Sequence, residues 1–172
     1  MILQHLPELI QDFLKLDSYL SENIFYQKLS FVPLNKNSEV QNMAKQALTK
    51  QVIPYYSKLN LQANTSVYNF LVEPLKNANF HGPRDVNIEF ELFLTPLVIA
   101  ASYNDGGAYF KRQEVKEAWE NRIKFPEKHD AGVYGIGFGV GNELIYDLAD
   151  LIHVDVPRGI LYTGWIAKNF CR

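Results

Sequence analysis

The sequence has no glycine before Gly82, although ten glycines occur among its 172 residues. Most of them fall between Gly82 and Gly141. Glycine adopts backbone conformations that other residues avoid, and it lets other groups approach the main chain closely. The uneven distribution indicates that the first half is built from regular elements, whereas the second half needs special backbone geometry.

Cysteine, net charge and long apolar runs are also scarce. Cys171 is the only cysteine, so no disulfide can form within the chain, as is typical of a reducing, cytosolic setting. The formal net charge is −2 and gives no direct evidence for nucleic-acid binding. No run approaches the roughly 18 apolar residues of a membrane span, and the N-terminus lacks the features of a signal peptide. We therefore expect a cytosolic protein without membrane contact.

Apolar spacing predicts helices over most of residues 1–81. Residues 3–16, 38–56 and 64–80 each have apolar side chains three or four positions apart, which is typical of one buried helical face. Ser38 is a suitable N-cap for the second helix, and His81-Gly82-Pro83 ends the third. We expect residues 1–60 to form a helical extension that packs on the domain or dimerises through the apolar face of residues 3–16.

The second half has strand patterns. Residues 86–92 alternate between apolar and polar, whereas 96–103 are almost continuously apolar and predict a central strand buried on both faces. A charged segment with a short helix near 114–121 follows, and then an amphipathic helix over 142–150. Two strands flank the turn at Pro157-Arg158-Gly159. This order predicts an α+β fold with an antiparallel or mixed sheet and helices on one face.

Three motifs could carry chemistry. On the third helix, Glu73, Asn77 and His81 are four apart and share a face, where a carboxylate and an amide oxygen could serve hydrated Mg²⁺. A solvated helix face explains the same spacing. Asn104-Asp105-Gly106-Gly107 follows the central strand, where Asp105 could accept a hydrogen bond from an exocyclic amine. A tight turn is the alternative, since Asp-Gly is preferred there.

The third motif has glycine at every second position. Gly135, Gly137, Gly139 and Gly141 precede a helix, so their backbone N–H groups could bind phosphate near a helix N-terminus. The spacing matches neither the dinucleotide fingerprint nor the phosphate loop, because no βαβ unit and no Gly-Lys-Ser/Thr is present. Close helix packing would also require small residues.

The three motifs in this order resemble the GHKL, or Bergerat-fold, ATP-binding domain of sensor histidine kinases and related ATPases. The resemblance covers about residues 60–170 and is strongest to stand-alone anti-sigma-factor serine kinases, whose helix reads Glu-x-x-x-Asn-Ala-x-x-His-Gly. Glu73, Asn77, Ala78, His81 and Gly82 match it. The resemblance implies a two-layer α/β sandwich with a mixed sheet over residues 61–172, and it implies binding of ATP and Mg²⁺.

The resemblance also implies a role for each matching position. Asn77 would bind Mg²⁺, and Glu73 would be the general base. Asp105 would accept a hydrogen bond from the adenine amino group, and Gly107 would lie beneath the adenine ring. Gly135, Gly137 and Gly139 would wrap the phosphates, and residues 108–134 would be a mobile lid. Thr163 would support the adenine pocket, and Lys76 and His81 would add charge near the phosphates.

Three positions depart from the family pattern. Pro74 follows Glu73 directly, which disfavours helical geometry at Glu73 and predicts its displacement. Tyr109 stands in place of a glycine. Trp119 and Phe125 make the lid more apolar than a free loop needs, which suggests packing against the body or a partner.

Two functions follow from the resemblance. The first is a regulatory protein kinase or ATPase that acts with a protein partner, with a serine of that partner as the expected acceptor of a kinase. The second is a non-catalytic module that binds the nucleotide but lacks a working base. A helical scaffold with a chance glycine cluster would require all three motifs to be coincidental.

Overall fold

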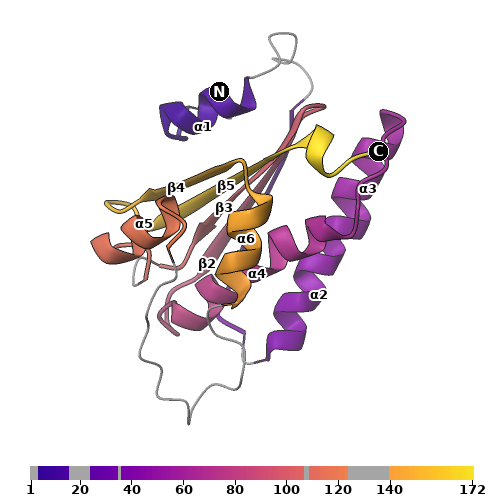
Figure 1. Ribbon diagram of the computed structural model, residues 1–172. Helices are drawn as coiled ribbons and strands as arrows, with labels where there is room; N and C mark the ends of the chain where they lie inside the picture. The colour runs from indigo at the N-terminus through magenta and orange to yellow at the C-terminus, as the bar shows by residue number, and fades with distance from the viewer. Residues whose placement is uncertain (1–3, 16–23, 35, 107–108, 124–139) are drawn as a thin grey trace.

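The computed structural model describes residues 4–15, 24–34, 36–106, 109–123 and 140–172. In this part of the chain, five strands form one sheet in the order β1-β2-β3-β5-β4 (Figure 1). The strands are β1 Phe25–Phe31, β2 Ile88–Leu94, β3 Val98–Asn104, β4 Leu151–Asp155 and β5 Ile160–Ile166. The α+β prediction is confirmed. The expectation of a mixed sheet is wrong, because every pair of neighbouring strands is antiparallel.

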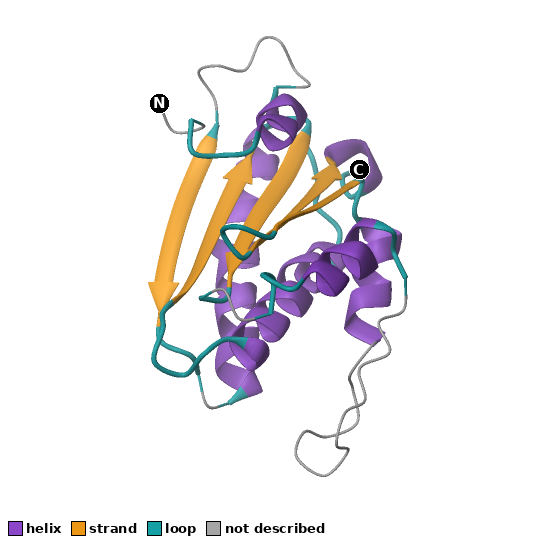
Figure 2. Ribbon diagram, turned by 90° about the vertical axis from the view of Figure 1, so that its left-hand side faces the viewer, coloured by secondary structure: helices purple, strands orange, loops and turns teal. Residues whose placement is uncertain are grey.

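Helices cover both faces of the sheet. The main layer contains α2 Asn37–Ala47, α3 Ile53–Lys58, α4 Ser66–His81 and α6 Val140–Leu148, and α5 Gln113–Glu120 packs beside β4. On the opposite face lies α1 Glu8–Leu14 (Figures 1 and 2). The main layer and the sheet are compatible with a two-layer sandwich, and α1, from the expected N-terminal extension, packs on the other face of the sheet.

Strand β3 is buried on both faces, as its apolar run predicts. Ile99, Ala101 and Tyr103 face the main helix layer, and Val98 and Ala100 face α1. Each of these side chains is at most 2% exposed. Because β3 lies between β2 and β5, its register positions both halves of the molecule.

The prediction of helices through residue 81 is wrong for β1. Phe25 pairs with Leu94 and Phe31 with Ile88, so the N-terminal segment contributes an edge strand to the sheet. Phe25, Leu29 and Phe31 pack against the main core. These odd-numbered apolar positions form a period-two pattern, which is the signal for this strand.

The helical stretch predicted over 38–56 is present but contains a π-helical turn. Leu48–Val52 adopts this wider turn between α2 and α3. Pro54 follows at the start of α3. A proline ring collides with the carbonyl four residues earlier, here that of Lys50, and the wider turn provides room for it.

Helix α4 continues through Pro74 without a break. Proline cannot donate the hydrogen bond that the Phe70 carbonyl would otherwise receive. The hydroxyl of the fully buried Tyr103 donates to that carbonyl instead, at 3.4 Å. The predicted displacement of Glu73 is therefore wrong, because Glu73 stays on a regular helix.

We expect Tyr103→Phe to destabilise the protein by about 1 kcal/mol, because the Phe70 carbonyl loses its donor. In a Pro74→Ala background the new backbone N–H can serve that carbonyl, so the same substitution should cost less. Urea denaturation of the four proteins in this double-mutant cycle measures the difference. An equal cost in both backgrounds would contradict this explanation of how Pro74 is accommodated.

Helix α1 packs on a sheet surface that lacks a side chain at one position. Leu6, Ile10 and Leu14 are buried against Phe93, Val98, Ala100 and Tyr162. The Phe13 ring lies over Gly164 of β5, where a Cβ atom would collide with it. Leu6, Ile10, Phe13 and Leu14 belong to the apolar face on which the expectation of dimerisation rests, and they are packed inside the molecule, whereas Leu9 is exposed.

Gly164→Ala tests this packing, because two effects have opposite signs. Strand propensity alone predicts a gain of roughly 0.5–1 kcal/mol. Collision with Phe13 predicts a net loss of about 1–3 kcal/mol. We expect a loss in chemical denaturation, and we expect it to disappear when Phe13 is also changed to Ala. A loss of the same size without the Phe13 ring would rule out this contact as the cause.

Candidate functional site

One face of α4 carries the first motif. Glu73, Asn77 and His81 are one helical turn apart, and all three are half-buried. The opposite flank has a structural role: the buried Asn79 amide accepts from Leu34 N at 2.7 Å and donates to Leu34 O at 3.0 Å. The two asparagines of the motif therefore lie on different sides of the helix, and only Asn77 shares the face of Glu73.

The Glu73 carboxylate forms an ion pair with Lys76. The Lys76 Nζ lies 2.8 Å from Glu73 Oε1, and the side chains are 29% and 17% exposed respectively. Because the pair is partly buried, solvent and salt screen it less than they screen a surface ion pair. A residue expected to act as a base is therefore held by a cation of its own helix.

The end of α4 touches the Asp105 turn. A Cβ on Gly82 would lie 2.7 Å from the Ala78 carbonyl oxygen and 2.8 Å from that of Asp105. No larger residue fits there without movement of backbone. This contact brings together the first two motifs, which are separated by a β-hairpin in the sequence.

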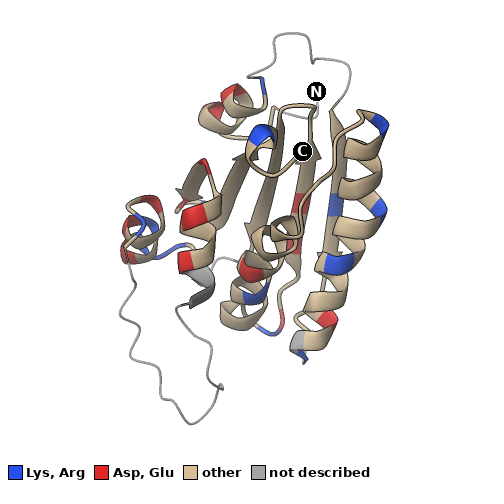
Figure 3. Cartoon of the chain, turned by 45° about the vertical axis from the view of Figure 1, so that its right-hand side comes forward, with Lys and Arg blue, Asp and Glu red and all other residues tan. Residues whose placement is uncertain are grey.

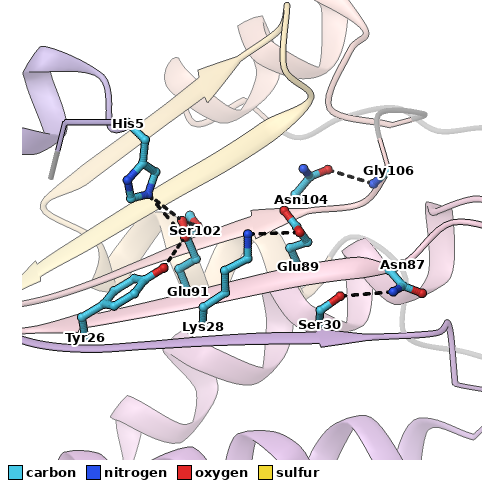
Figure 4. A network of polar contacts seen from close by, with 10 residues as sticks. All are labelled: His5, Tyr26, Lys28, Ser30, Asn87, Glu89, Glu91, Ser102, Asn104 and Gly106. Atoms are coloured by element: carbon cyan, nitrogen blue, oxygen red, sulfur yellow. Dashed lines mark hydrogen bonds and ion pairs between the residues drawn. The ribbon is translucent and has the colours of Figure 1, made fainter. Parts of the chain in front are cut away.

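Asp105 is fully buried and organises the turn after β3. Its Oδ2 accepts from the backbone N–H groups of Tyr109, at 2.9 Å, and Phe110, at 3.2 Å. The next residue, Gly106, has φ +76°, and its N–H donates to the Asn104 side chain at 2.9 Å (Figure 4). The turn that the Asp-Gly sequence favours is therefore present, with Asp105 as an acceptor within it.

Tyr109 packs against the end of the first motif. Its ring is stacked on the His81 imidazole, with centroids 4.2 Å apart and planes 9° from parallel. Tyr109 is 5% exposed, so the stack is largely closed to solvent. The residue that departs from the family pattern thus ties the Asp105 turn to α4.

The described part of the expected lid, residues 109–123, packs against the rest of the structure. Trp119 of α5 is fully buried and contacts Phe110 and Tyr146 edge to face. Glu120 Oε1 accepts from Val154 N at 2.9 Å, which joins α5 to β4. The Arg122 guanidinium donates to the Tyr146 and Ala149 carbonyls at the end of α6. Trp119 packs against the body, as its apolar character suggests, and Phe125 lies outside the described residues.

The glycines expected to contact the nucleotide all lie outside the described residues, namely Gly107, Gly135, Gly137 and Gly139. The helix expected at 142–150 is present as α6, which begins at Val140 and packs against α4. The element that follows the third motif is therefore next to the element that carries the first.

Thr163 is not brought to the Asp105 turn. It pairs with Ala101 on β3, four residues before Asp105, which corresponds to roughly 13 Å along the strand. Its buried hydroxyl has no hydrogen bond of good geometry within the described residues. Burial raises the pKa of Tyr103, and the neighbouring Thr163 hydroxyl opposes part of that rise. Thr163 thus belongs to the core beneath α4.

The three motifs do not include Glu91, a buried carboxylate on the other face of the sheet. Glu91 accepts from Tyr26 OH at 2.8 Å and from Ser102 Oγ at 2.9 Å, and it lies 3.3 Å from His5 Nε2 (Figure 4). Burial, then the Glu91 carboxylate, raises the pKa of Tyr26 to about 12. The strand register brings Tyr26 of β1, Glu91 of β2 and Ser102 of β3 together, and His5 reaches them from the segment before α1.

Charged side chains are unevenly placed over the surface. Exposed lysines lie along α2 and α3, whereas α5 and α6 carry acidic residues (Figure 3). No group of three or more His, Cys, Asp or Glu side chains suited to a metal ion occurs among the described residues. Glu73 and Asn77 supply two oxygen donors, which suits Mg²⁺ because it is usually held by one or two protein groups and by phosphates.

Sequence comparison identifies no relative. No protein-family model matches the chain, and no curated protein has significant similarity to it. Within the part of the chain that the structure describes, every helix is too short or too polar to cross a membrane.

We expect Asp105→Ala to destabilise the fold by about 2–4 kcal/mol, because two buried N–H groups lose their acceptor. Asp105→Asn keeps an acceptor oxygen and should cost about 1 kcal/mol or less. Thermal and chemical unfolding of both variants measures the difference. Equal losses would show that the negative charge, and not the acceptor, holds the turn.

Proposed function

We propose that the chain binds ATP with Mg²⁺ through a GHKL-type site, with the Bergerat fold over residues 61–172. The observation that carries this proposal is the contact of Gly82 with the Asp105 carbonyl, which joins the first two motifs. Packing of α6 against α4 adds support, because α6 directly follows the glycine motif. Chance motifs would have no reason to meet at a contact that excludes every side chain.

Each site residue would contact a different part of the ligand. Asn77, together with the phosphates, would hold Mg²⁺, and bound Mg²⁺ would neutralise phosphate charge. Asp105, whose Oδ2 accepts from two backbone N–H groups of its own turn, would accept from the adenine amino group. His81 lies between these positions on α4. Thr163 contributes least to the proposal, because it is placed away from Asp105.

The biological setting follows from the same resemblance. We propose a cytosolic regulatory protein that acts with a protein partner, either as a protein kinase or ATPase or as a nucleotide-binding module. Most apolar side chains of α1 pack on the sheet, so a partner or a second copy would meet another surface.

The non-catalytic alternative is favoured by one observation, the ion pair of Glu73 with Lys76. A general base must accept a proton from the attacking hydroxyl or water. In this structure an ammonium group occupies Glu73 Oε1. Binding without turnover is therefore the expected behaviour of the protein as it stands.

Calorimetry with ATP and Mg²⁺ tests the site. Wild-type protein should bind, and both Asn77→Ala and Asp105→Asn should lower the affinity at least about tenfold. Lys58→Met is a matched control, because Lys58 is exposed on α3 and outside the proposed site. No binding by the wild type, or unchanged affinity in both site variants, would reject the assignment.

A further inference from the structure

Lys76 and Asn77 lie on opposite sides of Glu73 around α4. At 100° per residue, Asn77 lies about 40° to one side of Glu73 around the helix, and Lys76 about 60° to the other. Glu73 therefore stands between the cation and the proposed Mg²⁺ ligand. The 2.8 Å ion pair reaches across the side of Glu73 that faces away from Asn77.

The partial burial of this pair distinguishes it from an ordinary surface pair. The Lys28–Glu89 pair is 3.1 Å long, and its side chains are 44% and 40% exposed. In the Lys76–Glu73 pair the corresponding values are 29% and 17%. Water competes less for a less exposed pair, so its geometry is more persistent.

We propose that Lys76 is a positioning residue that restrains Glu73, so that the protein retains bound ATP with little turnover. This inference rests on the proposed function. In turnover by hydrolysis, a water oxygen would bond to the terminal phosphorus as the bond to the bridging oxygen breaks. The water proton would pass to the Glu73 carboxylate, and ADP would leave with the electron pair of the broken bond. Lys76 opposes this step because its ammonium holds the carboxylate through Oε1, on the side of Glu73 that faces away from Asn77.

Lys76→Met tests the restraint, with Lys58→Met as a control and Lys76→Arg as the conservative variant. ATP affinity from calorimetry and turnover at saturating ATP are measured for each protein. We expect Lys76→Met to raise turnover at least about tenfold, since a general base contributes roughly 10²–10⁴-fold. Its ATP affinity should stay within about twofold of wild type. Lys76→Arg and Lys58→Met should behave like the wild type.

A double variant shows whether any gain passes through Glu73. The increase in turnover caused by Lys76→Met should be lost in the double variant Glu73→Gln/Lys76→Met. The double variant should still bind ATP. A tenfold loss of affinity in Lys76→Met without a gain in turnover would overturn the proposal, because Lys76 would then contact phosphate. Unchanged affinity and turnover would overturn it too. Failure of the wild type to bind ATP would instead reject the proposed function.

Discussion

Burial of β3 on both faces is the constraint on which the other packing relations depend. A strand in this position contacts a helix layer through every second residue and a different layer through the others. Tyr103 therefore reaches α4 while Ala100 lies under α1. The strand then ends at the Asp105 turn, so the position of that turn relative to α4 is set by the core. A ligand site at this place would be built at the end of a strand that is buried on both faces.

Two prolines show how the fold accommodates a local conflict. Pro54 follows a π-helical turn, and Pro74 lies in a helix whose lost hydrogen bond is replaced by Tyr103. The two solutions differ. The one at Pro54 changes the helix itself, and the one at Pro74 uses the Tyr103 side chain from the sheet. The path of α4, and therefore the shared face of Glu73 and Asn77, depends on the core hydroxyl of Tyr103.

Periodic apolar residues predicted most of the fold. The central strand, the hairpin of β4 and β5, and helices α4, α5 and α6 follow from spacing and turn residues. Strand β1 was missed because a short edge strand between helical patterns carries a weak period-two signal. The placement of α1 could not be predicted, since an apolar helical face does not specify which side of a sheet it will cover.

The candidate site was predictable only as a set of residue types. The motif spacing placed Glu73, Asn77 and His81 on one helix face, and the Asp-Gly sequence indicated a turn. The Tyr109–His81 stack and the Lys76–Glu73 pair depend on side-chain direction and on contacts between distant segments, which spacing does not contain. The same holds for Thr163, because only the register of β3 and β5 separates it from Asp105.

Intramolecular bonds at the site affect binding and catalysis differently. Asp105 Oδ2 is engaged by backbone N–H groups that also form the turn, so this engagement orients the carboxylate. The Lys76 bond to Glu73 is different, because it ties a carboxylate expected to act as a base to a cation of its own helix. A group that must first leave its own partner acts only in the fraction of molecules where it has done so. On the proposed function, this arrangement would favour nucleotide binding over turnover, and a change that drew Lys76 away from Glu73 would shift that balance.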